Sequence, residues 1–364
     1  MYLTKGIKKL YIDIKKIANS KIGSVDFDNL GFGNIFSDHM LSIDYKDSKW
    51  GDPSITPFGE ISFLPSLSTL HYGQAVFEGM KAFKTKDGKI NLFRPQRHHE
   101  RLNKSSKRLC IPEISYDKFL EPIIELIKLD KDWIPNKINT ALYLRPFIFA
   151  TDDFLGIRIS ETYKYMVITC PVGLYYKEGI KPISLITSGE YVRAVKGGLG
   201  EAKTPANYAA SLYPTALAKE QGYTQVIWLD GIEKKYIDEI GTTNIFLLID
   251  DELITPPLDG AILDGITRDS VIQIAKKLGI KVTERRISID EVFEASEKNK
   301  LHDAFGTGTA AVISPIGKIR HLDKEITINN NETGNLAKQI YEEVAGIQYG
   351  EKEDIFNWCY SLLP

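Results

Sequence analysis

The amino-acid sequence predicts two α/β (or α+β) domains, and three observations support this prediction. The chain has 364 residues, whereas single domains cluster near ~150 residues, so two domains are expected. Both halves mix short β-like runs with amphipathic helical segments. A stretch rich in Pro, Gly and charge, PVGLYYKEGIKP, separates the halves. We therefore expect an N-terminal domain over residues 1–175 and a C-terminal domain over residues 176–364.

The first half begins with short strands, continues with two helices and ends with two longer strands. Its β-like runs lie at 40–45, 60–67, 89–93, 140–150 and 163–173. The Asp-Gly pair at 87–88 is typical of a hairpin turn. Apolar periodicity predicts helices over 97–109 and 116–129.

The second half alternates strands and helices more regularly. Strands are expected at 183–187, 224–230 and 244–250. Helices are expected at 206–221, 267–278 and 334–345. Gly279 follows the second of these helices, where a glycine commonly ends a helix.

Composition and charge argue against several classes of protein. The 46 lysine and arginine residues nearly balance the 48 aspartate and glutamate residues, and the net charge is −2. Nucleic-acid-binding proteins normally show a basic excess, so no nucleic-acid partner is expected. The apolar run at 245–249 is far shorter than the ~20 residues of a membrane-spanning helix, so no membrane association is expected.

The cysteines and histidines indicate a cytoplasmic protein without a catalytic metal. Cys110, Cys170 and Cys359 are far apart and odd in number, which favours a reducing compartment. The lysine-rich start lacks arginine and contains Asp13, so we interpret it as part of the mature fold. The six histidines show no metal-ligand spacing.

The most unusual segment is KGGLGEAKTPANYAAS, residues 196–211, in which three glycines precede Lys203. Glycines let the backbone approach another group closely, and Pro205 suits the first turn of a helix. A lysine fixed just before a helix is a candidate for imine chemistry. The alternative is an ordinary solvated lysine, because lysine is rarely buried.

Two further segments have the pattern of phosphate-binding turns. LDGITRDS (263–270) places Gly265, Ile266 and Thr267 at the start of a helix, where backbone N–H groups favour an anion. FGTGTAA (305–311) alternates small residues that can turn N–H groups and hydroxyls inward. The alternative for each is a simple turn with a threonine cap.

Charged residues next to apolar strands supply the remaining candidates. Glu239 comes just ahead of the apolar strand at 244–250, and a carboxylate there needs a cation. The partner is either a protonated pyridine nitrogen or a structural arginine. Arg94 ends a predicted strand, and Tyr143 and Arg145 share one strand face. Arginine at such a position suits a phosphate or a carboxylate, or is an ordinary edge residue.

Taken together, these segments resemble the branched-chain amino-acid aminotransferases of the fold-type IV pyridoxal-phosphate class. The resemblance extends from about residue 36 to residue 315. The matching segments are LHYGQAVFEGMKAF, LFRP, RLNKSSKRLCIP, LYLRP, VRAVKGG, AKTPANYAAS, EIGTTNIF, TPPLDGAILDGITR and FGTGTA. The resemblance implies a D-amino-acid-aminotransferase-like fold with a smaller N-terminal and a larger C-terminal α/β domain.

The resemblance also implies pyridoxal 5'-phosphate as cofactor and assigns residues to it. Lys203 would form the Schiff base and shuttle the proton, and Glu239 would pair with the pyridine nitrogen. Tyr208 resembles the tyrosine that contacts the cofactor's phenolic oxygen. The remaining cofactor-binding residues, mostly around the phosphate, would be Arg94, Arg193, Thr242, Leu263, Ile266, Thr267 and Thr309.

The implied reaction transfers an amino group between L-leucine, L-isoleucine or L-valine and 2-oxoglutarate, giving branched-chain 2-oxo acids and glutamate. The enzyme would be a homodimer, with Leu155 and Ile157 reaching the partner's pocket. The other implied substrate-binding residues are Phe36, Tyr72, Phe77, Tyr143, Arg145, Tyr175, Thr242, Thr309 and Ala310. Arg145 is the first candidate for tolerating the glutamate side chain.

Two alternatives and two departures accompany this interpretation. The alternatives are another fold-type IV enzyme, such as a D-amino-acid aminotransferase or an aminodeoxychorismate lyase, and a catalytically silent ligand-binding homologue. Some members carry a C-x-x-C pair after the GTGTA turn, where this chain has Ala311 and Ser314, so thiol control is not expected. Thr204, Pro205 and Ala206 after Lys203 also depart from the usual pattern, and Pro205 should stiffen that turn.

Overall fold

The computed structural model describes residues 10–173 and 181–362. The chain divides into two units. The first comprises Met1–Lys84, Gly88–Gly173 and Tyr360–Pro364, and the second comprises Thr85–Asp87 and Leu174–Cys359. The main division lies next to the predicted boundary at residue 175. The C-terminal residues differ from the prediction, because the last strand joins the sheet of the first unit.

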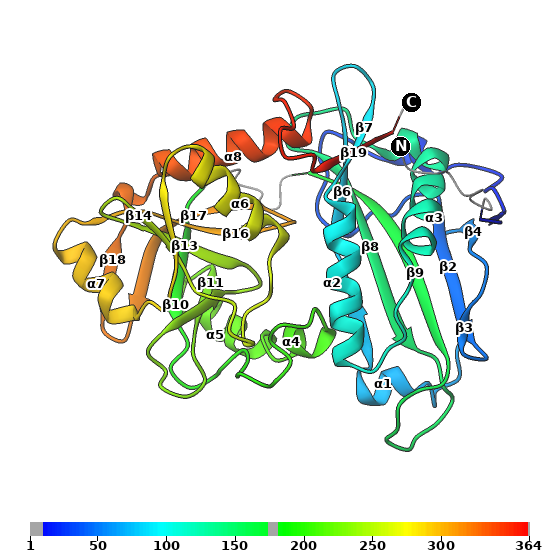
Figure 1. The fold of residues 1–364 in the computed structure, drawn as a ribbon, viewed down its shortest axis with the longest axis horizontal. Coiled ribbons are helices and arrows are strands. Elements are labelled where there is room, and N and C mark those ends of the chain that lie inside the picture. The colour runs from blue at the N-terminus through cyan, green and yellow to red at the C-terminus, as the bar shows by residue number, and fades with distance from the viewer. Residues whose placement is uncertain (1–9, 174–180, 363–364) are drawn as a thin grey trace, which may run out of the picture. The chain divides into compact units, whose positions relative to one another are not determined.

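The first unit is built on one mixed sheet in the order β1-β4-β2-β9-β8-β6-β7-β19, with β3 beside β2 and β5 beside β8 (Figure 1). Its strands are β1 (Asp13–Ile14), β2 (His39–Lys46), β3 (Lys49–Trp50), β4 (Ser54–Pro57), β5 (Ala75–Phe77), β6 (Met80–Lys84), β7 (Ile90–Phe93), β8 (Ala141–Ala150), β9 (Tyr163–Val172) and β19 (Cys359–Leu362). The longest pairing is antiparallel, between β8 and β9.

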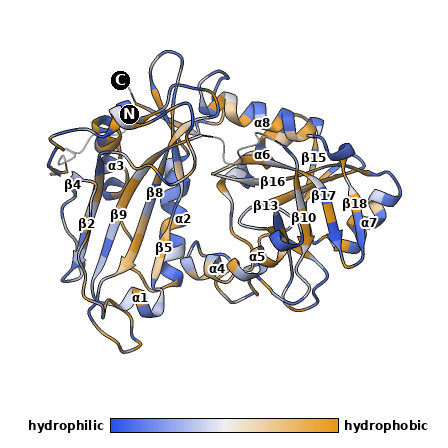
Figure 2. Cartoon of the chain, turned by 180° about the vertical axis from the view of Figure 1, so that it is seen from behind, coloured by the Kyte–Doolittle hydropathy of each residue, from blue (hydrophilic) through white to orange (hydrophobic). Residues whose placement is uncertain are grey.

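Helices α2 (Pro95–Arg108) and α3 (Tyr116–Leu129) contribute apolar side chains to the core of this unit. Phe119, Ile123, Leu126 and Ile127 of α3 are buried, as the periodicity predicts. Figure 2 shows the apolar character of β8 and β9. The short helix α1 (Ser68–Tyr72) and the 3-10 turns η1 (Ile22–Ser24) and η2 (Lys131–Trp133) complete the unit.

A buried charged cluster joins helix α2 to the segment between β5 and β6. Glu78 is fully buried, and its two carboxylate oxygens accept from the Nε and Nη2 atoms of Arg101 at 2.7 and 2.8 Å. His98 Nδ1 lies 2.7 Å from the same carboxylate. Burial alone would raise the pKa of Glu78, but Arg101 and His98 hold it well below its ordinary value.

The second unit contains another mixed sheet, in the order β12-β11-β10-β17-β16-β13-β14-β15, with β18 beside β17. Its strands are β10 (Ile183–Thr187), β11 (Gln225–Leu229), β12 (Ile237–Ile240), β13 (Asn244–Ile249), β14 (Glu252–Thr255), β15 (Lys281–Glu284), β16 (Leu301–Gly308), β17 (Val312–His321) and β18 (Lys324–Thr327). Parallel and antiparallel pairs both occur.

Helices α5, α6, α7 and α8 of the second unit contact this sheet, and the short helix α4 precedes α5 (Figure 1). They are α4 (Pro205–Ala209), α5 (Leu212–Glu220), α6 (Ile266–Lys277), α7 (Ile289–Glu297) and α8 (Asn335–Gln348), with the 3-10 turn η3 (Asn329–Asn331). Helices α6 and α8 contact each other as well as the sheet. In the described residues, no helix is long and apolar enough to cross a membrane.

The two-domain α/β prediction is confirmed, and most predicted elements are found within a few residues of their expected positions. The strand predicted at 60–67 is wrong: this segment forms only an isolated bridge at Leu67. Pro65 lacks the N–H that a strand ladder needs. The helix predicted at 206–221 is two helices, because Pro214 cannot donate to the carbonyl of Ala210 and its ring crowds that carbonyl.

We predict that Glu78→Gln destabilises the protein by about 3–5 kcal/mol near neutral pH, because Arg101 would keep its buried charge without a counter-ion. The folded pKa of Glu78 is depressed, so its stabilisation is complete above its ordinary pKa of 4.5 and is lost as the pH falls toward the lower folded value. Urea unfolding at pH 7 and below pH 4.5 measures both effects.

The matched control is Glu100→Gln, because Glu100 lies on helix α2 beside Arg101 but is exposed and pairs with the partly exposed Arg97. This control should change the free energy of unfolding by no more than about 0.5 kcal/mol. Equal losses for the two variants, or a constant loss for Glu78→Gln at every pH, would contradict the prediction.

Candidate active site

The predicted nucleophilic lysine lies immediately before helix α4. Lys203 is half-buried, and its Nζ donates to the hydroxyl of Tyr208 at 2.9 Å. Pro205 occupies the first helical position, as predicted, and the helix brings Tyr208 back toward the lysine. Asn207, on the same helix, donates its side-chain amide to the carbonyls of Leu199 and Ala202, both at 2.8 Å. Helix α4 therefore holds Lys203 through Tyr208 and holds the residues before Lys203 through Asn207.

Glu239 forms an ion pair with Arg193, and both side chains are largely buried. As predicted, Glu239 precedes the apolar strand β13; it also lies inside β12 and is 3% exposed. Burial raises its pKa, while Arg193, the backbone N–H of Leu263 and Lys203 oppose that rise. The structural-arginine alternative for Glu239 is therefore found here. Contact of Glu239 with a pyridine nitrogen remains a prediction.

Arg193 also connects two backbone segments to this carboxylate. Its Nη2 donates to the carbonyl oxygens of Gly200 at 3.2 Å and Ala261 at 2.5 Å. Gly200 precedes the lysine, and Ala261 precedes the turn into α6. These contacts give Arg193 a structural role, and its predicted place in the phosphate shell is untested.

The two predicted phosphate-binding turns belong to the second unit. Gly265 is the N-cap of α6, and Ile266 and Thr267 form its first turn. The N–H groups of a first helical turn have no acceptor within the helix, and they favour an anion. Thr309 and Ala310 lie in the turn between β16 and β17.

The turn after β12 packs against the glycine-rich end of β16. Gly241 has a φ of 49°, and Trp228 Nε1 donates to its carbonyl at 2.8 Å. A Cβ at Gly308 would lie 2.9 Å from Thr243 Cγ2, so this close approach requires glycine. The segment that carries Thr242 therefore lies next to the segment that leads into the turn at 309–310.

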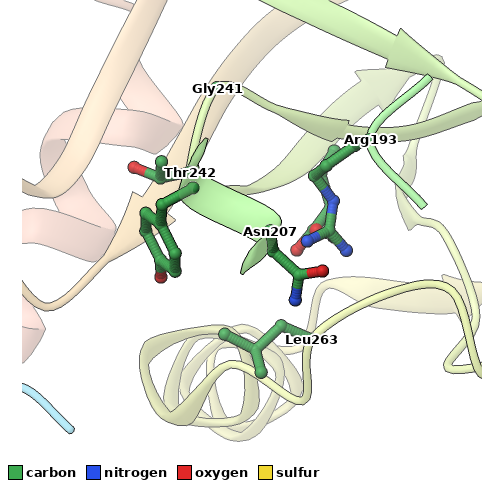
Figure 3. A pocket seen from close by; sticks show the side chains of 7 residues that line it. Arg193, Asn207, Gly241, Thr242 and Leu263 are labelled. Atoms are coloured by element: carbon green, nitrogen blue, oxygen red, sulfur yellow. Dashed lines mark ion pairs between the residues drawn. The ribbon is translucent and has the colours of Figure 1, made fainter. Parts of the chain in front are cut away.

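A pocket in the second unit collects several of these side chains (Figure 3). Figure 3 shows Arg193, Asn207 and Leu263 coming from three separate segments toward one hollow, with Thr242 on its rim. The pocket is lined by Arg193, Asn207, Tyr208, Glu239, Gly241, Thr242 and Leu263. Five of these were predicted from sequence, namely Arg193, Tyr208, Glu239, Thr242 and Leu263.

Predicted substrate-binding residues of the first unit form a separate cluster. Arg145 Nη2 donates to the hydroxyl of Tyr143 at 2.9 Å, and its guanidinium lies 4.7 Å from the ring centre of Phe77. The Nε of Arg145 is buried without a hydrogen-bond partner in the described structure. This cluster combines aromatic surface with one cation.

The other predicted residues of the first unit are dispersed. Phe36 stacks on Phe58 with ring centres 4.8 Å apart. The Tyr72 hydroxyl donates to the carbonyl of Leu155, and Ile157 is 89% exposed. Arg94 is buried at the N-cap of α2 with a φ of 50°. The remaining prediction, Tyr175, lies outside the described residues.

The sequence analysis missed two asparagines of the site. Asn207 follows Lys203 by four residues, and this spacing in the sequence could have indicated that Asn207 lies near the lysine. Asn244 Nδ2 donates to Glu239 Oε1 at 2.9 Å, a contact that depends on how tightly the chain turns after β12. Among the described residues, no group of three or more His, Cys, Asp or Glu side chains could hold a metal ion.

Residues 75–319 match the family model for class IV aminotransferases, and the chain belongs to this family. Enzymes of this class depend on pyridoxal phosphate, so the cofactor prediction is confirmed. The chain is 52% identical over 344 residues to branched-chain-amino-acid aminotransferase 2 of Bacillus subtilis, covering 94% of this chain and 95% of that protein.

Solved structures agree with this assignment. The branched-chain amino acid aminotransferase of Escherichia coli matches with a TM-score of 0.70 and 28% identity, covering 88% of this chain and 98% of that one. The T.th. enzyme complexed with N-(5'-phosphopyridoxyl)-L-glutamate matches with a TM-score of 0.70, 26% identity and coverages of 87% and 97%. The same enzyme has also been solved with 4-methylvaleric acid.

The residues of the second unit suit the chemistry of the cofactor. The amine of Lys203 beside the Tyr208 hydroxyl suits an aldehyde with a neighbouring phenolic oxygen. The buried Glu239 carboxylate suits a protonated ring nitrogen. The N-terminus of helix α6 suits a phosphate. All three belong to one compact unit. The donor set therefore fits pyridoxal phosphate.

Proposed function

We propose that this protein is a branched-chain-amino-acid aminotransferase that interconverts leucine, isoleucine or valine and 2-oxoglutarate with the corresponding 2-oxo acids and glutamate. The observation that carries the proposal is the Lys203–Tyr208 pair within a class IV aminotransferase chain. The names of the relatives and solved structures support this substrate class.

Each catalytic group has a distinct task in this reaction. Bound pyridoxal phosphate supplies an electron-withdrawing ring that stabilises negative charge at the substrate Cα. Lys203 Nζ binds the cofactor and moves the proton at that carbon, and Tyr208 orients the amine through their 2.9 Å hydrogen bond. Glu239 holds a proton on the ring nitrogen, and Arg193 favours the ionised carboxylate needed for this.

We assign the phosphate to the first turn of α6, with Ile266 and Thr267, together with Thr309. The backbone N–H groups of such turns bind an anion without added charge on the chain. Thr242, Thr309 and Ala310 are assigned to the substrate carboxylate. These assignments rest on motif correspondence and on the chemistry of the turns.

Phe77, Tyr143 and Arg145 give the proposed side-chain site two kinds of surface. Aromatic rings favour burial of an aliphatic chain, while one methylene changes binding by only ~1–3 kcal/mol, so all three branched-chain substrates should react. The guanidinium between Tyr143 and Phe77 offers a partner for the second carboxylate of glutamate. Phe36, Tyr72 and Tyr175 complete the proposed set.

We predict that glutamate and 2-oxoisocaproate support rapid turnover, while D-alanine and pyruvate do not. A coupled assay for 2-oxoglutarate and a chiral assay for the amino-acid product measure this difference. A preference for D-alanine would instead favour a D-amino-acid aminotransferase. Pyridoxal-phosphate binding without turnover of any amino acid would favour the silent homologue.

We predict that the purified protein is yellow and that borohydride attaches the cofactor permanently to Lys203. Lys203→Ala should lose the yellow absorbance and at least about a thousand-fold of the transaminase rate, because it removes both the amine and the proton carrier. The exposed Lys196, seven residues earlier, provides the control Lys196→Ala. Peptide mapping that finds the reduced cofactor on another lysine would refute this assignment.

We further propose that the enzyme is a cytoplasmic homodimer. Two segments of the first unit expose apolar side chains, and a hydrogen bond from Tyr72 to Leu155 joins them. The exposed residues are Ile61, Phe63, Leu64, Leu70, Phe154, Leu155, Ile157 and Ile159. Exposed apolar side chains on two segments that touch suit contact with a second copy of the chain. Free thiols at Cys110, Cys170 and Cys359 suit a reducing compartment.

We predict that Ile157→Glu weakens the dimer, because it would bury a charge in the proposed contact. Light scattering after size-exclusion chromatography should show a monomer fraction at micromolar concentration that wild type lacks. The matched control is Ile232→Glu, since Ile232 is 85% exposed in the second unit. A monomeric wild-type enzyme would contradict the proposal.

A further inference from the structure

Asn244 lies where a tight turn reverses the chain after β12. Ile240 and Thr243 form an isolated bridge, with backbone hydrogen bonds of 3.0 and 2.8 Å in the two directions. Gly241 permits the reversal through its positive φ. The turn returns the chain beside Glu239, so Asn244, the first residue of β13, can reach the Glu239 carboxylate.

The side-chain amide of Asn244 makes two directed contacts. Its Nδ2 donates to Glu239 Oε1 at 2.9 Å and to the carbonyl oxygen of Leu263 at 3.0 Å. The N–H of Leu263 in turn stabilises the Glu239 carboxylate. Glu239, Asn244 and the Leu263 peptide therefore close a ring of hydrogen bonds. Both amide hydrogens of Asn244 are used in this ring, and the residue is 5% exposed.

The ring connects the carboxylate to the start of helix α6. Leu263 precedes the N-cap, Gly265, by two residues. A Cβ at Gly265 would lie 1.9 Å from Asn244 Oδ1, so the glycine leaves the room that the asparagine occupies. Asn244 is thus in contact with the helix entrance as well as with Glu239.

We propose that Asn244 is a positioning residue that fixes Glu239 relative to the entrance of helix α6. In the proposed function these groups bind the two ends of one rigid cofactor, the ring nitrogen and the phosphate. A rigid ligand gains affinity from two sites only when their separation is set in advance. Asn244 sets this separation by donating to both groups at once.

The charges around Glu239 determine how the proposal is tested. Arg193 and Lys203 act on it from neighbouring segments, Tyr208 lines the same pocket, and Asp238 adjoins it on β12. Asn244→Asp preserves shape but replaces both donors with a second carboxylate. This change should raise the pKa of Glu239 further, so that Glu239 stays protonated to a higher pH.

We expect Asn244→Asp to weaken binding of pyridoxal phosphate to the apoenzyme roughly ten-fold or more, because hydrogen bonds to a charged group are lost. Fluorescence titration of the apoenzyme between pH 6 and 9 measures the dissociation constant. The ratio of variant to wild type should rise as the pH falls, because the second carboxylate favours protonation of Glu239 in the variant. A purely structural defect would weaken binding by the same factor at every pH.

Gly265→Ala provides an independent variant, because it displaces Asn244 without changing its donors. It should weaken cofactor binding, because the displaced amide of Asn244 can no longer donate to Glu239. The matched control is Asn103→Asp in the first unit, where the side chain likewise donates to a backbone carbonyl, that of Ile114, at 2.9 Å. This control should leave cofactor affinity unchanged, and thermal melting of each apoenzyme checks folding.

The outcomes separate this inference from the proposed function on which it rests. A wild-type protein that fails to bind pyridoxal phosphate contradicts the proposed function. A wild-type protein that binds it and transaminates, together with an Asn244→Asp variant of unchanged affinity, overturns the role of Asn244. The same holds if the affinity of this folded variant falls by one constant factor across the pH range.

Discussion

The ion pair between Arg193 and Glu239 is the interaction on which the site of the second unit depends. Removing two charges from water is costly, and additional hydrogen bonds to both ions recover part of the loss. Here Glu239 also accepts from Asn244, and Arg193 also donates to the carbonyls of Gly200 and Ala261. The pair therefore draws the lysine segment, strand β12 and the approach to α6 together.

The glycines around this pair follow from the same constraint. A Cβ at Gly200 would lie 2.0 Å from the carbonyl oxygen of Ala261, and one at Gly306 would lie 2.6 Å from Ile240 Cδ1. Glycine-rich motifs are usually attributed to contact with a ligand phosphate. In this chain, Gly200 is already required because its backbone closely approaches the Ala261 carbonyl that Arg193 also contacts.

Sequence patterns predicted the helices and strands that local interactions determine. They failed for features that depend on contacts between distant parts of the chain. Helix α3 matches its predicted range of 116–129 because its apolar periodicity is strong. The run at 60–67 forms no strand and is mostly exposed up to Pro65, and Pro65 was a local signal against a strand there. Lys203 and Glu239 were predicted through resemblance and residue chemistry. The bridging role of Asn244 depends on a turn geometry that composition does not specify.

The division of residues between the units has a chemical consequence. Lys203, Tyr208, Glu239 and α6 belong to the second unit, whereas Tyr143 and Arg145 belong to the first. The groups proposed to perform the reaction at Cα therefore belong to a different unit from those proposed to recognise the substrate side chain. If the proposed substrate residues are correct, changes in the first unit alter which amino acid is accepted and leave the buried network around Glu239 intact. The net charge of −2 is uninformative about this division, because a phosphate or a carboxylate needs only a few local donors.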